Sequence, residues 1–352
     1  MNFENAPAAA MVAIDPRTGE ILAMQSSTDY TQSKFNLAVD AKRQAGSTFK
    51  TYGLLAAMVD FGIDPYTTQY ATSPLENYPL IPGATDPNQL WTVNNAESAS
   101  AGVLPLDSAL EQSVNAVFAR LSIDIGAYNV ANMAYKLGIP KSDHLPEVPS
   151  VILGSGAVSP LDMTHAYSTI AANGVRRPLL AIKKVQRYSG GPPQVSKPGK
   201  GVAVIPDGAT ADVTKFLDAN VHSCCTGLNA AVSPYRAQAG KTGTTDDHTD
   251  AWFCGYTPNI AACVWVGYPA TIWNRFATAA FASEPTKFPP TPWPVPKHFI
   301  TFQPWHSPNF TLPVYKPPTS TKDGKPTTGG GGGGGGGSGG GTTTGGPPTT
   351  TR

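Results

Sequence analysis

The chain reads Ala45-Gly46-Ser47-Thr48-Phe49-Lys50 immediately before an apolar run at residues 52–59, and this stretch decides the fold. A run that is apolar on every side predicts a buried helix rather than a surface helix. Ser47 and Lys50 stand one helical turn apart, so their side chains would share one face at the edge of the core.

The order of these two residues is unusual for a helix start. We expect Ser47 to be the N-cap, which places Lys50 at the third helical position, where Glu or Gln is usual and the field of the helix terminus is positive. That field would lower the pKa of Lys50 and favour a neutral amine, a general base beside a nucleophilic hydroxyl. A plain N-cap followed by a solvated lysine explains the same spacing, because Ser-x-x-Lys is a loose pattern.

The composition describes a globular chain with no partner indicated by charge. Its 352 residues are 40% hydrophobic, enough for one large domain or two smaller ones. The formal charge is +1, from 25 basic and 24 acidic residues, and no long basic run suggests nucleic-acid binding. No stretch reaches the ~18 to 20 apolar residues of a membrane span, and residues 1–10 lack signal-peptide features, so we expect this chain alone to be soluble.

Five short stretches near the two ends of the chain predict strands. They are residues 11–14, 21–24, 237–245, 251–256 and 260–268. The first two flank the turn signal Asp15-Pro16-Arg17-Thr18-Gly19, and the last two are joined by a tight turn at Pro258-Asn259. Both pairs therefore predict hairpins.

The middle of the chain has helical periodicity. Apolar residues recur at intervals of three and four from Leu106 to Leu121, and further helices are predicted at residues 131–137, 163–172, 211–222 and 273–281. Residues 61–101 have no sustained period and predict an irregular excursion around the site. Residues 189–201 predict a polar interruption.

These elements predict an α+β fold: one antiparallel five-stranded sheet flanked by helices, with an inserted mostly helical subdomain. The active site would lie where the two parts meet. We expect residues 1–315 to form the folded domain. Residues 316–352 are rich in Gly, Pro and Thr, with an unbroken Gly run at 329–337, and predict a disordered tail.

The register of the last hairpin also predicts a disulfide. If Thr257 pairs with Ile260, Cys254 lies opposite Cys263 at a non-hydrogen-bonded position, where Cα atoms are ~4.5 Å apart. Burial as free thiols is the alternative. With Cys224-Cys225, the four cysteines are too few and too badly spaced for a disulfide scaffold or a zinc site.

Two further stretches could meet Ser47. Ser113-Val114-Asn115 offers a hydroxyl for a proton relay and a side-chain amide that could hydrogen-bond to an amide of the substrate. Ordinary polar residues on the surface of a helix are the alternative explanation. The pattern is weak, since Ser307-Pro308-Asn309 matches it too.

The other stretch, Lys241-Thr242-Gly243-Thr244, would lie on a strand with Lys241 pointing away from both threonines. On an edge strand, the N–H of Thr244 could pair with that of Ser47 as an oxyanion hole, Gly243 would permit close approach, and Lys241 could hold a carboxylate. A surface strand with a solvated lysine is the alternative.

Ser-x-x-Lys, Ser-x-Asn and Lys-Thr-Gly in this order, each in its expected structural context, resemble the penicillin-binding proteins. Four stretches narrow the resemblance to the transpeptidase domain of a class A, PonA-like member. They are residues 11–19 (MVAIDPRTG), 112–115 (QSVN), 243–247 (GTTDD) and 250–253 (DAWF). The resemblance covers residues 8–281.

The resemblance implies a serine-type D-Ala-D-Ala transpeptidase, an acyltransferase that cross-links peptidoglycan stem peptides and is acylated by β-lactam antibiotics. Ser47 would be the nucleophile, Lys50 the base, and the N–H groups of Ser47 and Thr244 the oxyanion hole. Ser113, linked to Lys241, would pass a proton to the departing D-alanine. An amine from a neighbouring stem would then take the acyl group.

The resemblance also assigns binding roles. Lys241, Thr242 and Thr244 would bind the substrate carboxylate beside Gly243, and Asn115 would bind its amide and position Lys50. No metal or organic cofactor is implied, and no nucleic acid. Class A proteins carry a membrane anchor and a glycosyltransferase domain before this domain, which implies a location on the extracytoplasmic face of the bacterial plasma membrane.

Other functions use similar motifs. A β-lactamase needs a deacylating base, but no Glu-x-x-Leu-Asn stretch occurs between Lys50 and Lys241. A D,D-carboxypeptidase differs only in using water as acceptor, and a non-enzymatic β-lactam sensor only binds the drug. A Ser-His-Asp hydrolase is disfavoured because, outside the Gly-rich tail, no Gly-x-Ser-x-Gly occurs.

Overall fold

A computed structural model describes most of the chain. The described residues are 8–26, 30–31, 33–80, 83–96, 102–232, 236–245, 249–266 and 269–312, without the side chains of 269–275. The tail expected at 316–352 lies outside them, so the domain boundary after residue 315 stays a prediction. No helix in the described ranges is long and apolar enough to cross a membrane.

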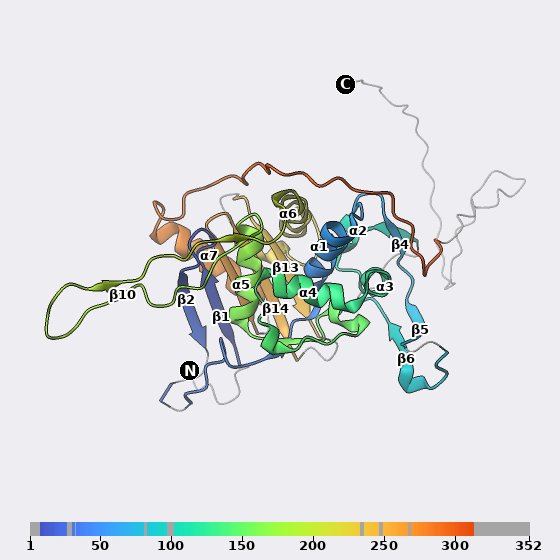
Figure 1. Ribbon diagram of the computed structural model, residues 1–352, viewed down its shortest axis with the longest axis horizontal. Coiled ribbons are helices and arrows are strands. Elements are labelled where there is room, and N and C mark those ends of the chain that lie inside the picture. The colour runs from blue at the N-terminus through green and yellow to red at the C-terminus, as the bar shows by residue number, and fades with distance from the viewer. Residues whose placement is uncertain are drawn as a thin grey trace, which may run out of the picture. The chain divides into compact units, whose positions relative to one another are not determined.

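A five-stranded antiparallel sheet is built from both ends of the chain, as the sequence predicts (Figure 1). Its strands are β1 Ala10–Ile14, β2 Ile21–Ser26, β13 Ala239–Thr244, β14 Ala251–Thr257 and β15 Ile260–Trp265. Their order is β13, β14, β15, β1, β2, so β13 and β2 are the edges. The first hairpin turns at Asp15, whose carbonyl accepts hydrogen bonds from Thr18 and Gly19, and Gly19 adopts φ +79°.

Helices cover both faces of the sheet. They include α5 Pro160–Ala171 on one face and α7 Pro269–Ser283 on the other. Val12 lies in the same buried cluster as Tyr167 of α5, whereas Ala13 lies in the cluster of Phe281 from α7. Adjacent strand residues therefore point to opposite faces, as the pleat requires.

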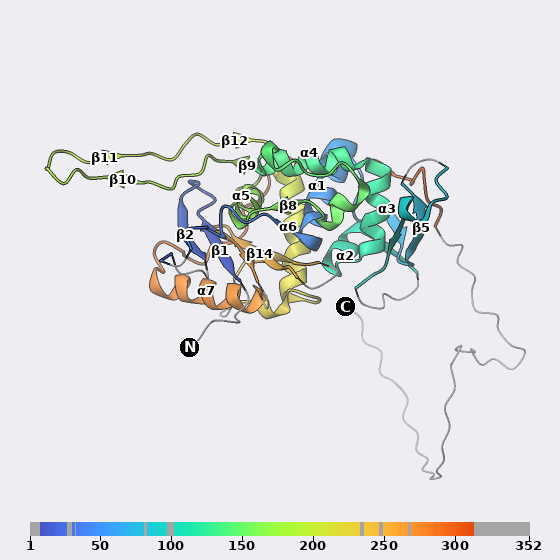
Figure 2. The same ribbon diagram turned by 90° about the horizontal axis from the view of Figure 1, so that it is seen from below.

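The apolar run at residues 52–59 forms most of the central helix, α1 Lys50–Phe61. Residues 52–58 are all buried, as predicted, because α1 packs among helices on several sides. These neighbours are α2 Leu106–Glu111, α3 Asn115–Ile125, α4 Ala127–Leu137 and α6 Asp207–His222. Figure 2 shows them gathered around α1 beside the sheet.

Residues 61–105 contain four short strands where only an irregular segment was expected. β4 Gln69–Ala71 pairs with β7 Val103–Pro105, and β5 Leu75–Pro79 pairs with β6 Leu90–Val93. These strands are three to five residues long. An alternating pattern so short is hard to distinguish from a loop.

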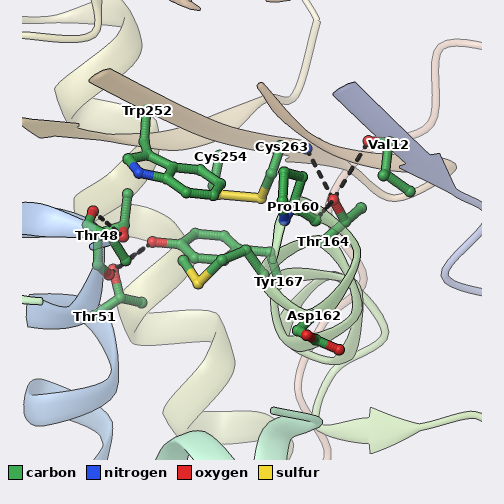
Figure 3. Close-up of a disulfide and its surroundings, with 12 residues drawn as sticks. Val12, Thr48, Thr51, Pro160, Asp162, Thr164, Tyr167, Trp252, Cys254 and Cys263 are labelled. Atoms are coloured by element: carbon green, nitrogen blue, oxygen red, sulfur yellow. Dashed lines mark hydrogen bonds between the residues drawn. A yellow bond between two sulfur atoms is a disulfide. The ribbon is translucent and has the colours of Figure 1, made fainter. Parts of the chain in front are cut away.

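The predicted disulfide is present (Figure 3). Cys254 lies opposite Cys263, with Cα atoms 4.1 Å apart and the two sulfur atoms bonded. Helix α5 packs beside it, and Thr164 accepts a hydrogen bond from the amide of Cys263 (3.2 Å). Tyr167, also on α5, donates to the carbonyl of Thr48 (2.9 Å). The centre of the sheet is thereby tied through α5 to the turn that precedes α1.

A second disulfide joins the neighbours Cys224 and Cys225, just after α6. Cys225 adopts φ +78°. The sequence analysis did not predict this bond, because spacing rules look for separated cysteines that close a loop.

The predicted polar interruption is an extended hairpin, which we call the arm and define as residues 181–201. β9 Val175–Arg176 and β12 Val202–Ala203 pair at its base, and β10 Lys184–Val185 and β11 Gln194–Val195 pair within it. Figures 1 and 2 both show the arm extending away from the sheet and helices.

Candidate active site

The Ser47 motif forms a short 3₁₀ helix rather than the first turn of an α-helix. This helix, η1, spans Gly46–Phe49, and α1 begins only at Lys50. The expected N-cap role of Ser47 is therefore wrong: Ala45 occupies that position, and no side chain caps the turn. Backbone hydrogen bonds fix the entry instead, since the carbonyl of Gly154 accepts from Ala45 and Gly46 (3.1 and 3.3 Å).

Ser47 is nevertheless well disposed to react. Its side chain is only partly buried. Its hydroxyl has no hydrogen-bond partner within the described part of the chain. Lys50 follows one turn later and is fully buried. The motif thus combines a free hydroxyl with a nearby desolvated amine.

Lys50 is held by the second predicted stretch. Its Nζ donates hydrogen bonds to Asn115 Oδ1 (2.6 Å), to the carbonyl of Ser113 and, at 3.2 Å, to Ser113 Oγ. Burial is the largest cause that lowers the pKa of Lys50 well below 10.5, and the charge of Lys241 adds to it. The predicted direction is confirmed, with burial as the leading cause instead of the helix terminus.

Ser113 lies at a break between two helices. Helix α2 ends at Glu111 and α3 begins at Asn115, and Ser113 adopts the left-handed φ of +59°. Its hydroxyl accepts from Lys241 Nζ at 2.8 Å as well as from Lys50 Nζ. One hydroxyl therefore touches both buried lysines, which suits it to pass protons.

Asn94 and Asn95, in the segment 61–101, hold the chain at the start of α3. Neither was predicted from the sequence. Asn94 accepts a hydrogen bond on its carbonyl from Asn115 Nδ2 (2.9 Å). Asn95 Oδ1 accepts from the amide of Ala116 at the start of α3 (2.9 Å). The only signal is the Asn-Asn pair itself, which is common in turns.

Strand β13 carries the third stretch along the edge of the sheet. Lys241 is fully buried, while Thr242 and Thr244 face outward, as strand alternation predicts. Burial lowers the pKa of Lys241 from 10.5 to about 7. A Lys241 amine that is neutral, or that shares its proton with Ser113, suits a proton relay through Ser113. The sequence had suggested a permanent positive charge at Lys241 instead.

Glycines allow β13 and η1 to approach closely. A Cβ atom on Gly46 would lie 2.7 Å from the amide nitrogen of Thr244, and one on Gly243 would lie 2.3 Å from the carbonyl of Ala45. Gly46 also requires φ +58°. The backbones next to Ser47 and Thr244 thus lie side by side, which is the arrangement that a two-amide oxyanion hole needs.

Thr226 is a further residue at this edge that the sequence analysis missed. Its hydroxyl lies 2.6 Å from that of Thr242 and is exposed. Asn220 of α6 donates to the carbonyl of Glu111 (2.6 Å) and, more weakly, to Thr226 (3.4 Å). Asn220 therefore connects the end of α2 to the strand edge.

Polar side chains also gather where β13 ends. Asp250 accepts hydrogen bonds from Arg43 (2.6 Å) and from the indole of Trp265 (2.9 Å). Asp250 and Arg43 border a cavity of about 360 Å³ that Thr245 and Thr249 also line. Arg43 is paired with Asp250, so its positive charge is already neutralised at this cavity.

The second match to Ser-x-Asn lies elsewhere. Ser307 accepts from the amides of Asn309 and Phe310 in a local turn, and Asn309 donates to Asp124 (2.6 Å). Neither contacts Ser47, Lys50 or Lys241 in the described structure. The structure thus brings the three predicted stretches together, and the second match to Ser-x-Asn lies apart from them.

Comparison with known proteins identifies the family. Residues 9–271 match the family model for the penicillin binding protein transpeptidase domain. Penicillin-binding protein 1A of Neisseria meningitidis is 31% identical over 263 residues, and that of Aquifex aeolicus is 35% identical over 261; each match covers 74% of this chain. The chain spans about a third of the length of these relatives (32% and 34%).

Solved structures with a similar fold belong to the same family. PonA1 from Mycobacterium tuberculosis has a TM-score of 0.69 and 26% identity, over 88% of this chain and 86% of that chain. A second PonA1 structure, with the same TM-score, is a complex with penicillin V. On these grounds, the chain belongs to the penicillin-binding protein transpeptidase family.

Proposed function

We propose that this chain is a D,D-transpeptidase that joins peptidoglycan stem peptides through a serine acyl-enzyme. Ser47 Oγ attacks the carbonyl between the two terminal D-alanines and forms an ester, and the bond to the last D-alanine breaks. An amine of a second stem peptide then attacks the ester and releases Ser47. No cofactor takes part in either step.

The observation that carries this proposal is the pair of buried lysines on one hydroxyl. Lys50 and Lys241 both donate to Ser113 Oγ, at 3.2 and 2.8 Å, and both pKa values are lowered. Two ammonium groups this close would repel, so at least one amine is favoured in its neutral form. Lys50, one turn from Ser47, is then the base that takes the proton of the attacking hydroxyl.

The same network returns the proton. Protonated Lys50 passes it to Ser113, and Ser113 delivers it to the nitrogen of the departing D-alanine, while Lys241 stabilises the hydroxyl. Asn115 holds Lys50 through Oδ1 and uses its Nδ2 on Asn94, so its positioning role has the stronger support. The N–H groups of Ser47 and Thr244 bind the oxyanion.

The substrate would bind along the outer side of β13. Thr242 and Thr244 point outward and present hydroxyls to the substrate carboxylate. Gly243 lets the strand approach η1. Lys241 is buried, so only its protonated form would attract the carboxylate, and it would do so from behind the strand.

We further propose that the chain works as part of a longer, membrane-anchored protein with a glycosyltransferase domain, outside the cytoplasm. The relatives are about three times as long as the matched region, which supports a larger protein. Two disulfides support an oxidising compartment.

Intact mass spectrometry after brief incubation with benzylpenicillin tests the acylation step. We expect one stable adduct on Ser47, none on Ser47→Ala, and an unchanged adduct on the decoy variant Ser307→Ala. Turnover of a soluble D-Ala-D-Ala stem peptide with an added acceptor amine then separates the possibilities. Cross-linked product supports a transpeptidase, release of D-alanine alone a carboxypeptidase, rapid loss of the penicillin adduct a β-lactamase, and no turnover a sensor.

A further inference from the structure

The arm has a charge unlike that of the rest of the chain. It contains no Asp or Glu, and its basic residues are Lys183, Lys184, Arg187, Lys197 and Lys200. The whole chain has 25 basic and 24 acidic residues, so 20 basic and 24 acidic residues remain outside the arm. A positive projection is thus attached to a slightly negative body, and such a field attracts polyanions.

The arm also lacks a core of its own. Every residue from 181 to 198 is exposed, including Ile182, Val185 and Val195, and Tyr188 has a relative exposure of 109%. A two-stranded hairpin on its own is marginally stable in water. The apolar side chains of the arm are therefore open to solvent and available for contact with a partner.

The distribution of these side chains indicates what kind of partner would fit. Lys184 lies opposite Val195, and Val185 lies opposite Gln194, so apolar groups stand on both faces of the ribbon. A rigid protein docked on one face would leave the other uncovered. A flexible linear polymer can contact both faces and the tip.

We propose that the arm is a second binding site for the polymeric substrate, a peptidoglycan strand. This inference rests on the proposed function, which makes stem peptides the substrate. An uncross-linked strand displays a carboxylate at the end of each stem for the lysines and arginine, and sugar rings with apolar faces for Tyr188. Holding one part of a strand at the arm raises the effective concentration of its other stems at Ser47.

The only ion pair described for the arm lies near its base. Lys183 pairs with Glu20 at 2.8 Å, and the backbone of Leu180 pairs with Glu20 and Ile21 beside it. Lys183 is therefore partly neutralised and helps to attach the arm to β2. Lys184 and Arg187 lie further out, and the register places Lys197 opposite Ile182; none of the three has an ion pair with any residue in the described ranges.

The test is co-sedimentation with purified insoluble peptidoglycan that has been stripped of protein and of phosphate polymers. Binding is measured with the active site free and with Ser47 already acylated by benzylpenicillin, which removes the contribution of the catalytic site. The arm variant is Lys184→Gln/Arg187→Gln/Lys197→Gln. The matched control removes three exposed lysines elsewhere, Lys141→Gln/Lys215→Gln/Lys287→Gln.

We expect the arm variant to bind roughly tenfold more weakly than wild type, because each exposed charge contributes a few-fold and three are removed. The control should change binding less than twofold. Raising NaCl from 50 to 500 mM should remove most of the wild-type binding, since exposed charges are screened. Tyr188→Ser should weaken binding a few-fold with no change in the dependence on salt.

Equal losses in the arm and control variants would overturn the proposal, because net charge alone would then explain binding. Arm-dependent binding to phosphatidylglycerol vesicles without binding to peptidoglycan would overturn it in favour of a lipid surface. Penicillin acylation and turnover of a soluble stem peptide should be unchanged in the arm variant. If wild type fails in those two reactions, the proposed function fails, whatever the arm binds.

Discussion

Replacing Lys241 with methionine should make the protein more stable near neutral pH while it damages the active site. Methionine preserves much of the aliphatic stem and carries no charge. Burial lowers the pKa of Lys241 from 10.5 to about 7, which measures how strongly the fold disfavours the ammonium form. One pKa unit corresponds to ~1.36 kcal/mol, so the cost to the folded state at pH 7 is on the order of 4 kcal/mol.

The substitution also removes favourable contacts. Lys241 Nζ donates to Ser113 Oγ at 2.8 Å and to the carbonyl of Thr242 at 3.2 Å. Hydrogen bonds of this kind contribute about 1 kcal/mol each. We therefore expect Lys241→Met to raise the free energy of unfolding by about 2 kcal/mol at pH 7.

The effect should depend on pH in a defined direction. Between pH 7 and pH 10.5 the unfolded state binds more protons at residue 241 than the folded state does, so wild-type stability rises with pH through this group. The variant lacks the group and should not show this rise. Its advantage should therefore shrink towards zero, or reverse, near pH 10.

Urea unfolding at pH 7, 8, 9 and 10 measures this difference, with the exposed Lys141→Met as control. Benzylpenicillin acylation, followed by intact mass, should be markedly slower in Lys241→Met and unchanged in the control. If Lys241→Met is less stable than wild type at pH 7, or differs from it equally at every pH, burial of the amine is not the dominant cost and the reasoning fails.

Three further predictions concern the serine turn and the sheet. Ser47→Ala should abolish the penicillin adduct and change the urea midpoint little, because the hydroxyl caps no helix; a large stability loss would contradict the geometry of η1. Gly46→Ala should lower both stability, by roughly 2 kcal/mol or more, and acylation, because its Cβ would meet Thr244 at φ +58°; wild-type acylation would refute the close approach. Cys254→Ser/Cys263→Ser should reduce stability by about 2–3 kcal/mol in urea, since the bond closes a short loop, and an unchanged midpoint would count against the bond.

The sequence by itself determined the five strands of the sheet and the register of its last hairpin. Alternating and apolar runs at both ends of the chain predict five strands, and the two-residue turn at Pro258-Asn259 places Cys254 opposite Cys263 by counting alone. Both follow from local chemistry, because turn residues and side-chain period act over only a few positions. The order of the three motifs along the chain similarly identified the family.

Local pattern was less informative about the start of α1. Ser47 has the chemistry of an N-cap, yet Gly46 and the carbonyl of Gly154 shape this turn into a 3₁₀ helix. Gly154 is more than 100 residues away in sequence, so no local rule includes it. The short strands of residues 61–105 and the disulfide between Cys224 and Cys225 were missed because their signals are too brief.

Only the tertiary structure decided that the amines of Lys50 and Lys241 are both buried. Nothing in Lys50 or Lys241 as a sequence position says whether the amine is solvated. Three segments of the chain meet at Ser113, exclude water from both amines and place them on one hydroxyl. Desolvation depends on everything that packs around a group, so the pKa values that the proposed chemistry needs arise only when the distant parts of the chain come together.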